Sequence, residues 1–346
     1  RTGDSLALLN VARMLNVGVP WNTSRPITHW NNVKTRLITY TYNDGTIEET
    51  RTEERVVGFT LSMIETKESL PDQIKYLDRL ETLSIISNSN SYLYEIELDD
   101  VVTKLEYLKS LSLFGYGISK LPASMGDMKN LEELNLSANT FHSLTDIIEP
   151  LKKLGPKLKY LNLASCRIVD GDATKNLKDT PNGIDPVSGR RIGLTGTLPK
   201  ELFTYFPNME YLNLSYNYLH GQIPELTEED FNGEEVLPKL RYLSVNLNRF
   251  TGAMPQWMVK HKYRGCWGAT ILIFNQEGRD YNGILAGFNN EREFTNDMPD
   301  CPTDEEEEET QLLNLPILNP EEKAATVEFS AKYPWEKYGN NCPIYG

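Results

Sequence analysis

The chain has 346 residues, 39% of them hydrophobic, which is enough to bury a large core in two compact domains or in one extended repeat array. Lys and Arg total 35 against 49 Asp and Glu, so the net charge is −14, and a nucleic-acid partner, which needs a basic surface, is disfavoured. We find no apolar run of transmembrane length and no signal-peptide pattern, and a first residue Arg1 is what a processed precursor or a trimmed sequence would give.

The first element that the residues predict directly is a β-hairpin at residues 40–47. Aromatic and β-branched residues on both sides flank Asp44-Gly45, a dipeptide that adopts the tight turn between two antiparallel strands.

An apolar frame, L-x-x-L-x-L-x-x-N, then recurs along the chain. It is cleanest at Leu131, Leu134, Leu136 and Asn139. Apolar residues two apart point the same way from a strand, and one such unit cannot bury its own apolar face. Stacked units sharing one continuous core are therefore predicted. The third apolar position of the frame is occupied by Leu61, Ile85, Leu113, Leu136, Leu163, Leu214, Val245 and, more weakly, Ile273.

The last position of the frame forms a polar column that we interpret as structural. A buried amide can donate to and accept from backbone groups that the turning chain leaves unpaired. Because a cysteine shares the column, its predicted role is a buried thiol and not a nucleophile. The column contains Asn88, Asn139, Cys166, Asn217 and Asn248, with Tyr116 and Gln276 at equivalent places.

Several units continue into a second pattern, L-x-G-x-I/L/M-P, which begins at Leu194, Leu219 and Phe250. With this pattern the chain resembles the plant-type leucine-rich repeat over about residues 4–276. The resemblance implies an α/β repeat solenoid, a horseshoe with a parallel concave β-sheet and short convex helices or 3-10 turns. It also implies a second short strand at each L-x-G-x-I-P segment and a helical stretch near residues 200–206.

The N-terminal residues are similar to the cap of such proteins, with a helix at residues 4–9, Trp21 and Trp30 in a crossing segment and a first strand at 55–62. The cap's paired cysteines are missing, which favours a bacterial cell-envelope protein over a plant ectodomain. The expected domains are an N-terminal cap (1–55, helix plus hairpin), the repeat array (56–276) with an inserted loop at about 169–192, and a C-terminal cap with an acidic linker (277–346).

Two segments raise the question of calcium. Asp170 and Asp172 in the inserted loop resemble the start of a calcium-binding loop, but Lys175 and Pro181 stand where that loop needs glycine and glutamate. The acidic run at 304–309 is more typical of a solvated linker than of a metal site. We predict no metal site and no cofactor.

Three of the four cysteines, Cys266, Cys301 and Cys342, lie at or after the last repeat. One bridge, Cys301 with Cys342, would fit an oxidising compartment, whereas free thiols would fit a reducing one. Both alternatives stay open.

The frame also predicts which side chains face the concave surface. Tyr160, Tyr211 and Tyr242 share one frame position in adjacent strands and should form a row. Tyrosine is enriched in binding surfaces, but an aromatic ladder also stabilises a sheet, and both interpretations stay open. Asparagines flank the row, and further residues extend it: Asn135, Asn162, Asn213, Asn246, Tyr216, Phe114 and Phe274.

The sequence contains no phosphate-binding loop, zinc-protease motif or nucleophile elbow. We therefore expect a non-catalytic recognition module, secreted or on the cell surface, that binds a protein or carbohydrate on its concave face. A bacterial outer-membrane lipoprotein, with a lipid anchor upstream of Arg1, is the expected setting. The alternatives are an intracellular scaffold or effector using the same face, and an enzyme whose site lies in the inserted loop or C-terminal segment.

Overall fold

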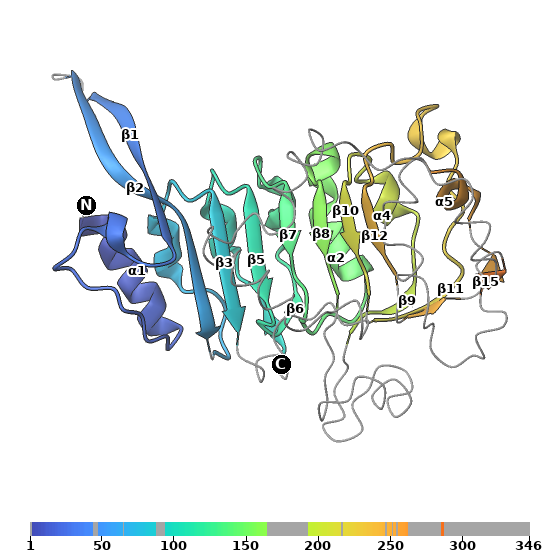
Figure 1. Cartoon of the computed structure of the whole chain (residues 1–346), viewed down its shortest axis with the longest axis horizontal. Helices are drawn as coiled ribbons and strands as arrows, with labels where there is room; N and C mark the ends of the chain where they lie inside the picture. Colours follow the sequence, from blue (N-terminus) through green and yellow to red (C-terminus); the bar gives the residue numbers. More distant parts are fainter. Residues whose placement is uncertain are drawn as a thin grey trace.

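The computed structural model describes residues 2–43, 48–64, 66–87, 94–164, 193–215, 217–245, 248–250, 252–253, 255–261 and 285–286. Within these residues the chain forms an elongated array in which successive strands lie side by side along the long axis (Figure 1). Of the expected C-terminal cap (277–346) only Leu285 and Ala286 are described, and the acidic run, the four cysteines and the weak repeat at Ile273 lie outside the described residues.

One eight-stranded sheet runs the length of the array. Its first two strands are antiparallel and every later pair is parallel. In sheet order the strands are β1 (Val33–Asn43), β2 (Glu48–Ile64), β3 (Thr82–Ser87), β5 (Ser110–Phe114), β7 (Glu133–Asn135), β8 (Tyr160–Asn162), β10 (Tyr211–Asn213) and β12 (Tyr242–Ser244).

The frame leucines explain why these strands stack. Leu134 of β7 lies in register with Leu161 of β8, which lies in register with Leu212 of β10 and Leu243 beyond it. All four side chains belong to one buried core. Since each repeat covers its neighbour's apolar face, burial propagates along the array, as expected for a quasi-one-dimensional repeat protein.

The L-x-G-x-I-P segments form a second parallel sheet, as the sequence predicts. β9 (Thr195–Thr197), β11 (Tyr218–Gly221) and β13 (Arg249–Phe250) pair in that order. Gly221 has φ +79°, a conformation that side chains disfavour, and an added Cβ would stand 3.1 Å from Thr197 Cγ2. The pattern's glycine therefore permits both the turn and the close approach of two repeats. Two smaller pairs are β4 (Ile96–Glu97) with β6 (Ile118–Lys120) and β14 (Gly252–Ala253) with β15 (Leu285–Ala286).

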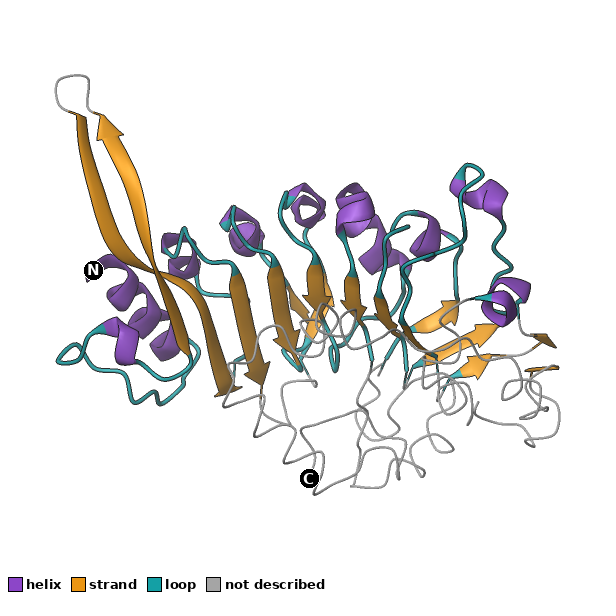
Figure 2. Cartoon of the chain, turned by 45° about the horizontal axis from the view of Figure 1, so that its top comes forward, coloured by secondary structure: helices purple, strands orange, loops and turns teal. Residues whose placement is uncertain are grey.

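Short helices return the chain from one strand to the next, and Figure 2 shows them in a row along one side of the array. Five of the eight are 3-10 helices, and three of the eight, η2, η5 and α5, begin just after a proline, which presets the backbone for the turn. They are η2 (Asp72–Tyr76), η4 (Asp100–Lys104), η5 (Ala123–Asp127), α2 (Thr145–Leu151), η6 (Lys152–Lys157), α4 (Glu201–Thr204), η8 (Glu228–Phe231) and α5 (Gln256–Lys260). No helix within the described residues is long and apolar enough to cross a membrane.

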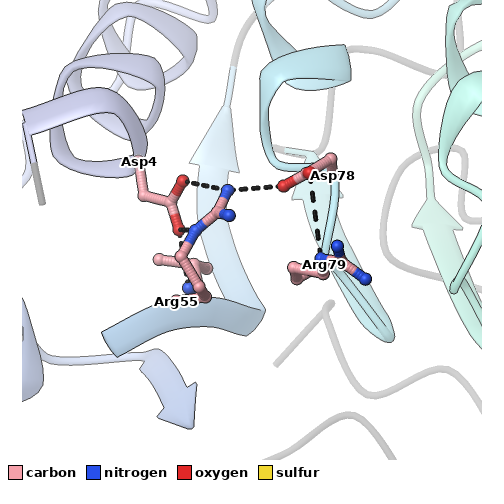
Figure 3. Close-up of polar contacts among 5 residues, drawn as sticks. Asp4, Arg55, Asp78 and Arg79 are labelled. Atoms are coloured by element: carbon pink, nitrogen blue, oxygen red, sulfur yellow. Dashed lines mark hydrogen bonds and ion pairs between the residues drawn. The ribbon is translucent and has the colours of Figure 1, made fainter. Parts of the chain in front are cut away.

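The N-terminal end of the core is closed by α1 (Thr2–Met14) and by the crossing segment that contains η1 (Ile27–His29). Trp21 and Trp30 stack with ring centroids 5.5 Å apart, and each indole N–H donates to a backbone carbonyl. Asp4 joins α1 to Arg55 of β2, which also contacts Asp78 (Figure 3).

The oversized step between Leu163 and Leu214 does not interrupt the main sheet, because β8 pairs directly with β10. The extra residues lie between β8 and β9, within a single repeat, and residues 169–192 fall outside the described part of the chain. Asn217 bonds both flanks of the insertion: its Nδ2 donates to the Leu163 carbonyl at 3.0 Å, and its Oδ1 accepts from the Leu194 N–H at 2.9 Å.

Candidate functional site

The polar column sits inside the turns and bonds backbone. Asn139 Nδ2 donates to the carbonyls of Leu113 and Leu136 at 2.7 and 2.9 Å, and its Oδ1 accepts from the Ile118 N–H at 2.9 Å. Asn248 makes the equivalent bonds three repeats further on. Each amide satisfies backbone groups of two repeats at once, so these side chains are occupied and do not face a ligand. Asn88 and Cys166 lie outside the described residues.

The tyrosines of β8, β10 and β12 lie in register on the concave surface of the main sheet. The rings of Tyr160 and Tyr211 stack with centroids 4.2 Å apart and an interplanar angle of 11°. Those of Tyr211 and Tyr242 stack at 4.3 Å and 4°. We refer to these three residues as the tyrosine row. Because the rings are parallel, each inner face is covered by a neighbour, and the row presents ring edges and hydroxyl groups.

Exposure increases along the row. Tyr160 is 8% exposed, whereas Tyr211 and Tyr242 are partly exposed. Burial raises the pKa of the Tyr160 and Tyr211 hydroxyls, so both stay protonated and can donate a hydrogen bond at neutral pH. Tyr211 and Tyr242 therefore provide the accessible surface, and Tyr160 packs against Tyr211 at the N-terminal end of the row.

The flanking asparagines are mainly occupied within their own strands. Asn135 Oδ1 accepts from the Ser137 hydroxyl at 2.6 Å, Asn162 Oδ1 accepts from the Ala164 N–H at 3.1 Å, and Asn213 Oδ1 accepts from the Ser215 hydroxyl at 2.7 Å. These bonds hold the chain as it leaves each strand, an Asx-type local contact that the frame alone does not reveal. Asn135 and Asn162 retain partial exposure.

Besides Tyr160, two further residues assigned to the concave contact surface from the sequence are buried. Asn213 is 2% exposed, and its Nδ2 donates to Tyr211 Oη at 3.4 Å. Phe114 is 6% exposed, since every residue of β5 is covered. Neither extends the accessible surface. The other extensions, Tyr216, Asn246 and Phe274, lie outside the described residues.

A carboxyl group continues the tyrosine row on its N-terminal side. Glu133 of β7 lies in register with Tyr160, and burial raises its pKa to about 7, with Glu132 and Glu210 adding to the rise and Lys159 opposing it. This residue was missed in the sequence. The sequence does contain a signal for it. At the frame position of the tyrosine row Glu133 is the single acid, and the other repeats have threonine, serine or tyrosine there.

A row of alternating charges lies beside the tyrosines, at the frame position before them. Lys109 contacts Glu81 at 3.5 Å and Lys159 contacts Glu132 at 2.7 Å across neighbouring repeats. Opposite charges in adjacent repeats favour the native alignment and disfavour a one-repeat slip. The complete row is Glu81, Lys109, Glu132, Lys159, Glu210 and Arg241. Within the described residues no group of three or more His, Cys, Asp or Glu could hold a metal ion.

A family model for the leucine-rich repeat matches residues 208–228, which contain both β10 and β11. Together with the stacked parallel strands and the asparagine column, this match identifies the fold as a leucine-rich repeat solenoid. The sequence-based fold class is thereby confirmed.

Two characterised proteins are similar to parts of this chain. The receptor-like protein CLAVATA2 of Arabidopsis thaliana is 44% identical over 59 residues, 17% of this chain and 7% of that protein. Adenylate cyclase of Schizosaccharomyces pombe (strain 972 / ATCC 24843) is 26% identical over 167 residues, 47% of this chain and 9% of that protein. In each case the chain spans less than a tenth of the relative's length. Among solved structures, a plant ice-binding protein superposes with a TM-score of 0.45 and 18% identity, covering 76% of this chain and 84% of that one.

Proposed function

We propose that this chain is a non-catalytic recognition module that binds an extended segment of a protein partner across the concave sheet, with Tyr211 and Tyr242 as the main contacts. The observation that carries the proposal is the parallel stacking of the tyrosine row. Stacked and partly buried, these rings lose little further conformational entropy on binding, which is the property that makes tyrosine effective in recognition surfaces.

The direction of the rings favours a protein over a carbohydrate. Sugars stack on the flat faces of aromatic rings, but both faces of Tyr211 are covered by its neighbours. What the row offers is hydroxyl tips and ring edges, together with the partly exposed amides of Asn135 and Asn162. Such groups match the backbone N–H and C=O groups of an extended peptide. Similarity to a receptor-like protein over one segment agrees with a recognition role.

The cellular location of the protein is also part of the proposal. Export to the cell surface, a bacterial envelope and a lipid anchor are the expectations drawn from the cap without cysteines, and the intracellular scaffold is the alternative. Mass spectrometry of the native protein in fractionated source cells separates them: an N-terminal lipid and recovery with the envelope would support export, and recovery with the cytosol would refute it. The division into 1–55, 56–276 and 277–346 is likewise retained as a proposal.

The binding proposal is tested by selecting a displayed random-peptide library and, in parallel, probing a glycan array with the same purified chain. The test variant is Tyr211→Ala/Tyr242→Ala, and the matched control is Tyr76→Ala, an exposed tyrosine on η2. We expect selected peptides that bind the wild type and the control equally and bind the double variant at least tenfold more weakly. Glycans bound in place of peptides, or peptides indifferent to the double variant, would contradict the proposal.

A further inference from the structure

A two-stranded ribbon projects from the N-terminal end of the array, as Figures 1 and 2 both show. It consists of β1 and the first half of β2, paired without a break from Thr35↔Val56 to Asn43↔Glu48. An isolated two-stranded ribbon is marginally stable in water. A ribbon of this length that covers no core is therefore typical of an element that pairs with something else.

The outer edge of this ribbon is unpaired within the described residues. β1 is the terminal strand of the eight-stranded sheet, and β2 is its one partner strand within the described residues; at the start of β1 the Val33 N–H also donates to the Trp30 carbonyl. Its backbone N–H and C=O groups on the far side form a template for one more strand, and proteins usually block such an edge with lysine, proline or a bulge. In β1 the bulge lies between Lys34 and Thr35, and the only charges of the strand are Lys34 and Arg36, all near its start.

The rest of the edge carries none of these protections. Residues 37–43, Leu-Ile-Thr-Tyr-Thr-Tyr-Asn, carry no charge and no proline, and after Leu37 all are β-branched, aromatic or amide-bearing. Leu37 is 66% exposed. An exposed, uncharged edge with high β-propensity is a strand-pairing site.

We propose that the free edge of β1 pairs with the same edge of a second copy of this chain, in antiparallel register, so that two main sheets join end to end. The two-fold axis of this dimer lies beside Ile38. Each residue then faces a residue of the second copy at the same distance from Ile38 on the other side: Thr35 faces Thr41, Arg36 faces Tyr40 and Leu37 faces Thr39. No like charges meet, because β1 contains no acid and its two basic residues face uncharged partners. The pair continues an existing sheet, so no new element has to form.

The net negative charge of the chain explains why two copies would meet at the ribbon and not at the body of the array. Two chains of net charge −14 repel each other, but the repulsion between exposed charges is screened beyond about 10 Å at 0.1 M salt. A ribbon that projects from the body lets the strands meet while the acidic surfaces stay apart. The dimer should therefore strengthen as salt is added.

The test is sedimentation velocity of the full chain over a dilution series at low and high salt. We expect a monomer–dimer equilibrium, weakened about tenfold or more by Leu37→Lys, which places a charge on the edge. The matched control is Leu6→Lys, the same change at a residue of α1 that is 52% exposed. Circular dichroism checks that both variants fold, and hydrogen exchange should show β1 amides that exchange more slowly as concentration rises.

If the chain remains monomeric at every concentration and salt level, the proposal is wrong. The free edge of β1 would then be a site for a strand of another protein. A dimer that is insensitive to Leu37→Lys, or equally weakened by Leu6→Lys, overturns it as well. If Leu37→Lys does not fold, Thr39→Lys on the same exposed edge strand provides the same readout.

Discussion

Asp4 of α1 and Arg55 of β2 form a two-point ion pair that fastens the N-terminal helix to the repeat array (Figure 3). Arg55 Nε and an Nη donate to the two carboxylate oxygens at 3.0 and 2.9 Å, and the Val56 N–H donates to the same carboxylate at 2.8 Å. Asp4 is 5% exposed, so water does not replace these partners. The carboxylate raises the pKa of Arg55 and holds its positive charge.

Replacing Asp4 by Asn should lower the free energy of unfolding by about 3 kcal/mol, because it leaves the largely buried guanidinium with only the exposed Asp78 as counter-charge. Urea unfolding followed by circular dichroism measures the change. The control is Asp78→Asn, which removes the partner whose side chain is 54% exposed and should cost less than about 1 kcal/mol. Equal effects of the two substitutions would show that Asp4 is not the essential partner.

Within the tyrosine row, the middle ring should matter most for stability. Tyr211→Ala removes two stacked contacts and should destabilise the fold by about 2–4 kcal/mol, whereas Tyr242→Ala removes one and should have about half that effect. Thermal unfolding of both variants provides the comparison. If Tyr242→Ala is the more damaging change, the row does not act as a stack.

Glu133 predicts how stability depends on pH. Its pKa is about 7 in the folded chain against an ordinary value of 4.5, so the folded state binds the proton more tightly than the unfolded state. The stability from this protonated form is present below about pH 4.5 and is lost as the pH rises through about 7. Glu133→Gln should therefore be more stable than the wild type at about pH 8, by at most about 3 kcal/mol, and similar to it at about pH 4.5.

Urea unfolding across this pH range checks the prediction. Glu97→Gln is the matched control, because its side chain is 73% exposed and it is not among the charges that shift the pKa of Glu133. A gain that is independent of pH would mean that Glu133 is charged in both states.

Asn217 should be among the polar residues least tolerant of change. It is 1% exposed and its amide bonds the backbone on both sides of the insertion. Asn217→Ala leaves several buried backbone groups unpaired and should cost about 2–4 kcal/mol. Asn208→Ala, which removes one exposed contact to the Pro156 carbonyl, is the control and should be nearly neutral. Calorimetry that shows similar melting temperatures for both variants would refute this role.

The repeat period and the inward leucines could be predicted from sequence because they follow from geometry that is the same in every repeat. Leu134, Leu161 and Leu212 stack as the frame requires. The position of the tyrosine row followed for the same reason. The exposure of each side chain could not be predicted, because it depends on the surrounding residues: Asn213 is 2% exposed, whereas Asn135 and Asn162 at the same frame position are partly exposed.

Sequence analysis also divided one element into two. A hairpin at 40–47 and a separate first strand at 55–62 were expected, whereas a single strand, β2, runs from Glu48 to Ile64 and serves both. Its first half pairs with β1 and its second half with β3. Polar residues such as Arg51 and Glu53 interrupt the apolar pattern between the two halves, so periodicity gave no indication that the strand is continuous.

Because a single amide side chain, that of Asn217, bonds the backbone just before and just after residues 165–192, the scaffold does not depend on what lies between. Insertions and deletions in that interval can accumulate without shifting the pairing of β8 with β10. The repeat therefore contains a position at which natural variation, or a protein engineer, can exchange a whole segment while the stacked sheet keeps its alignment.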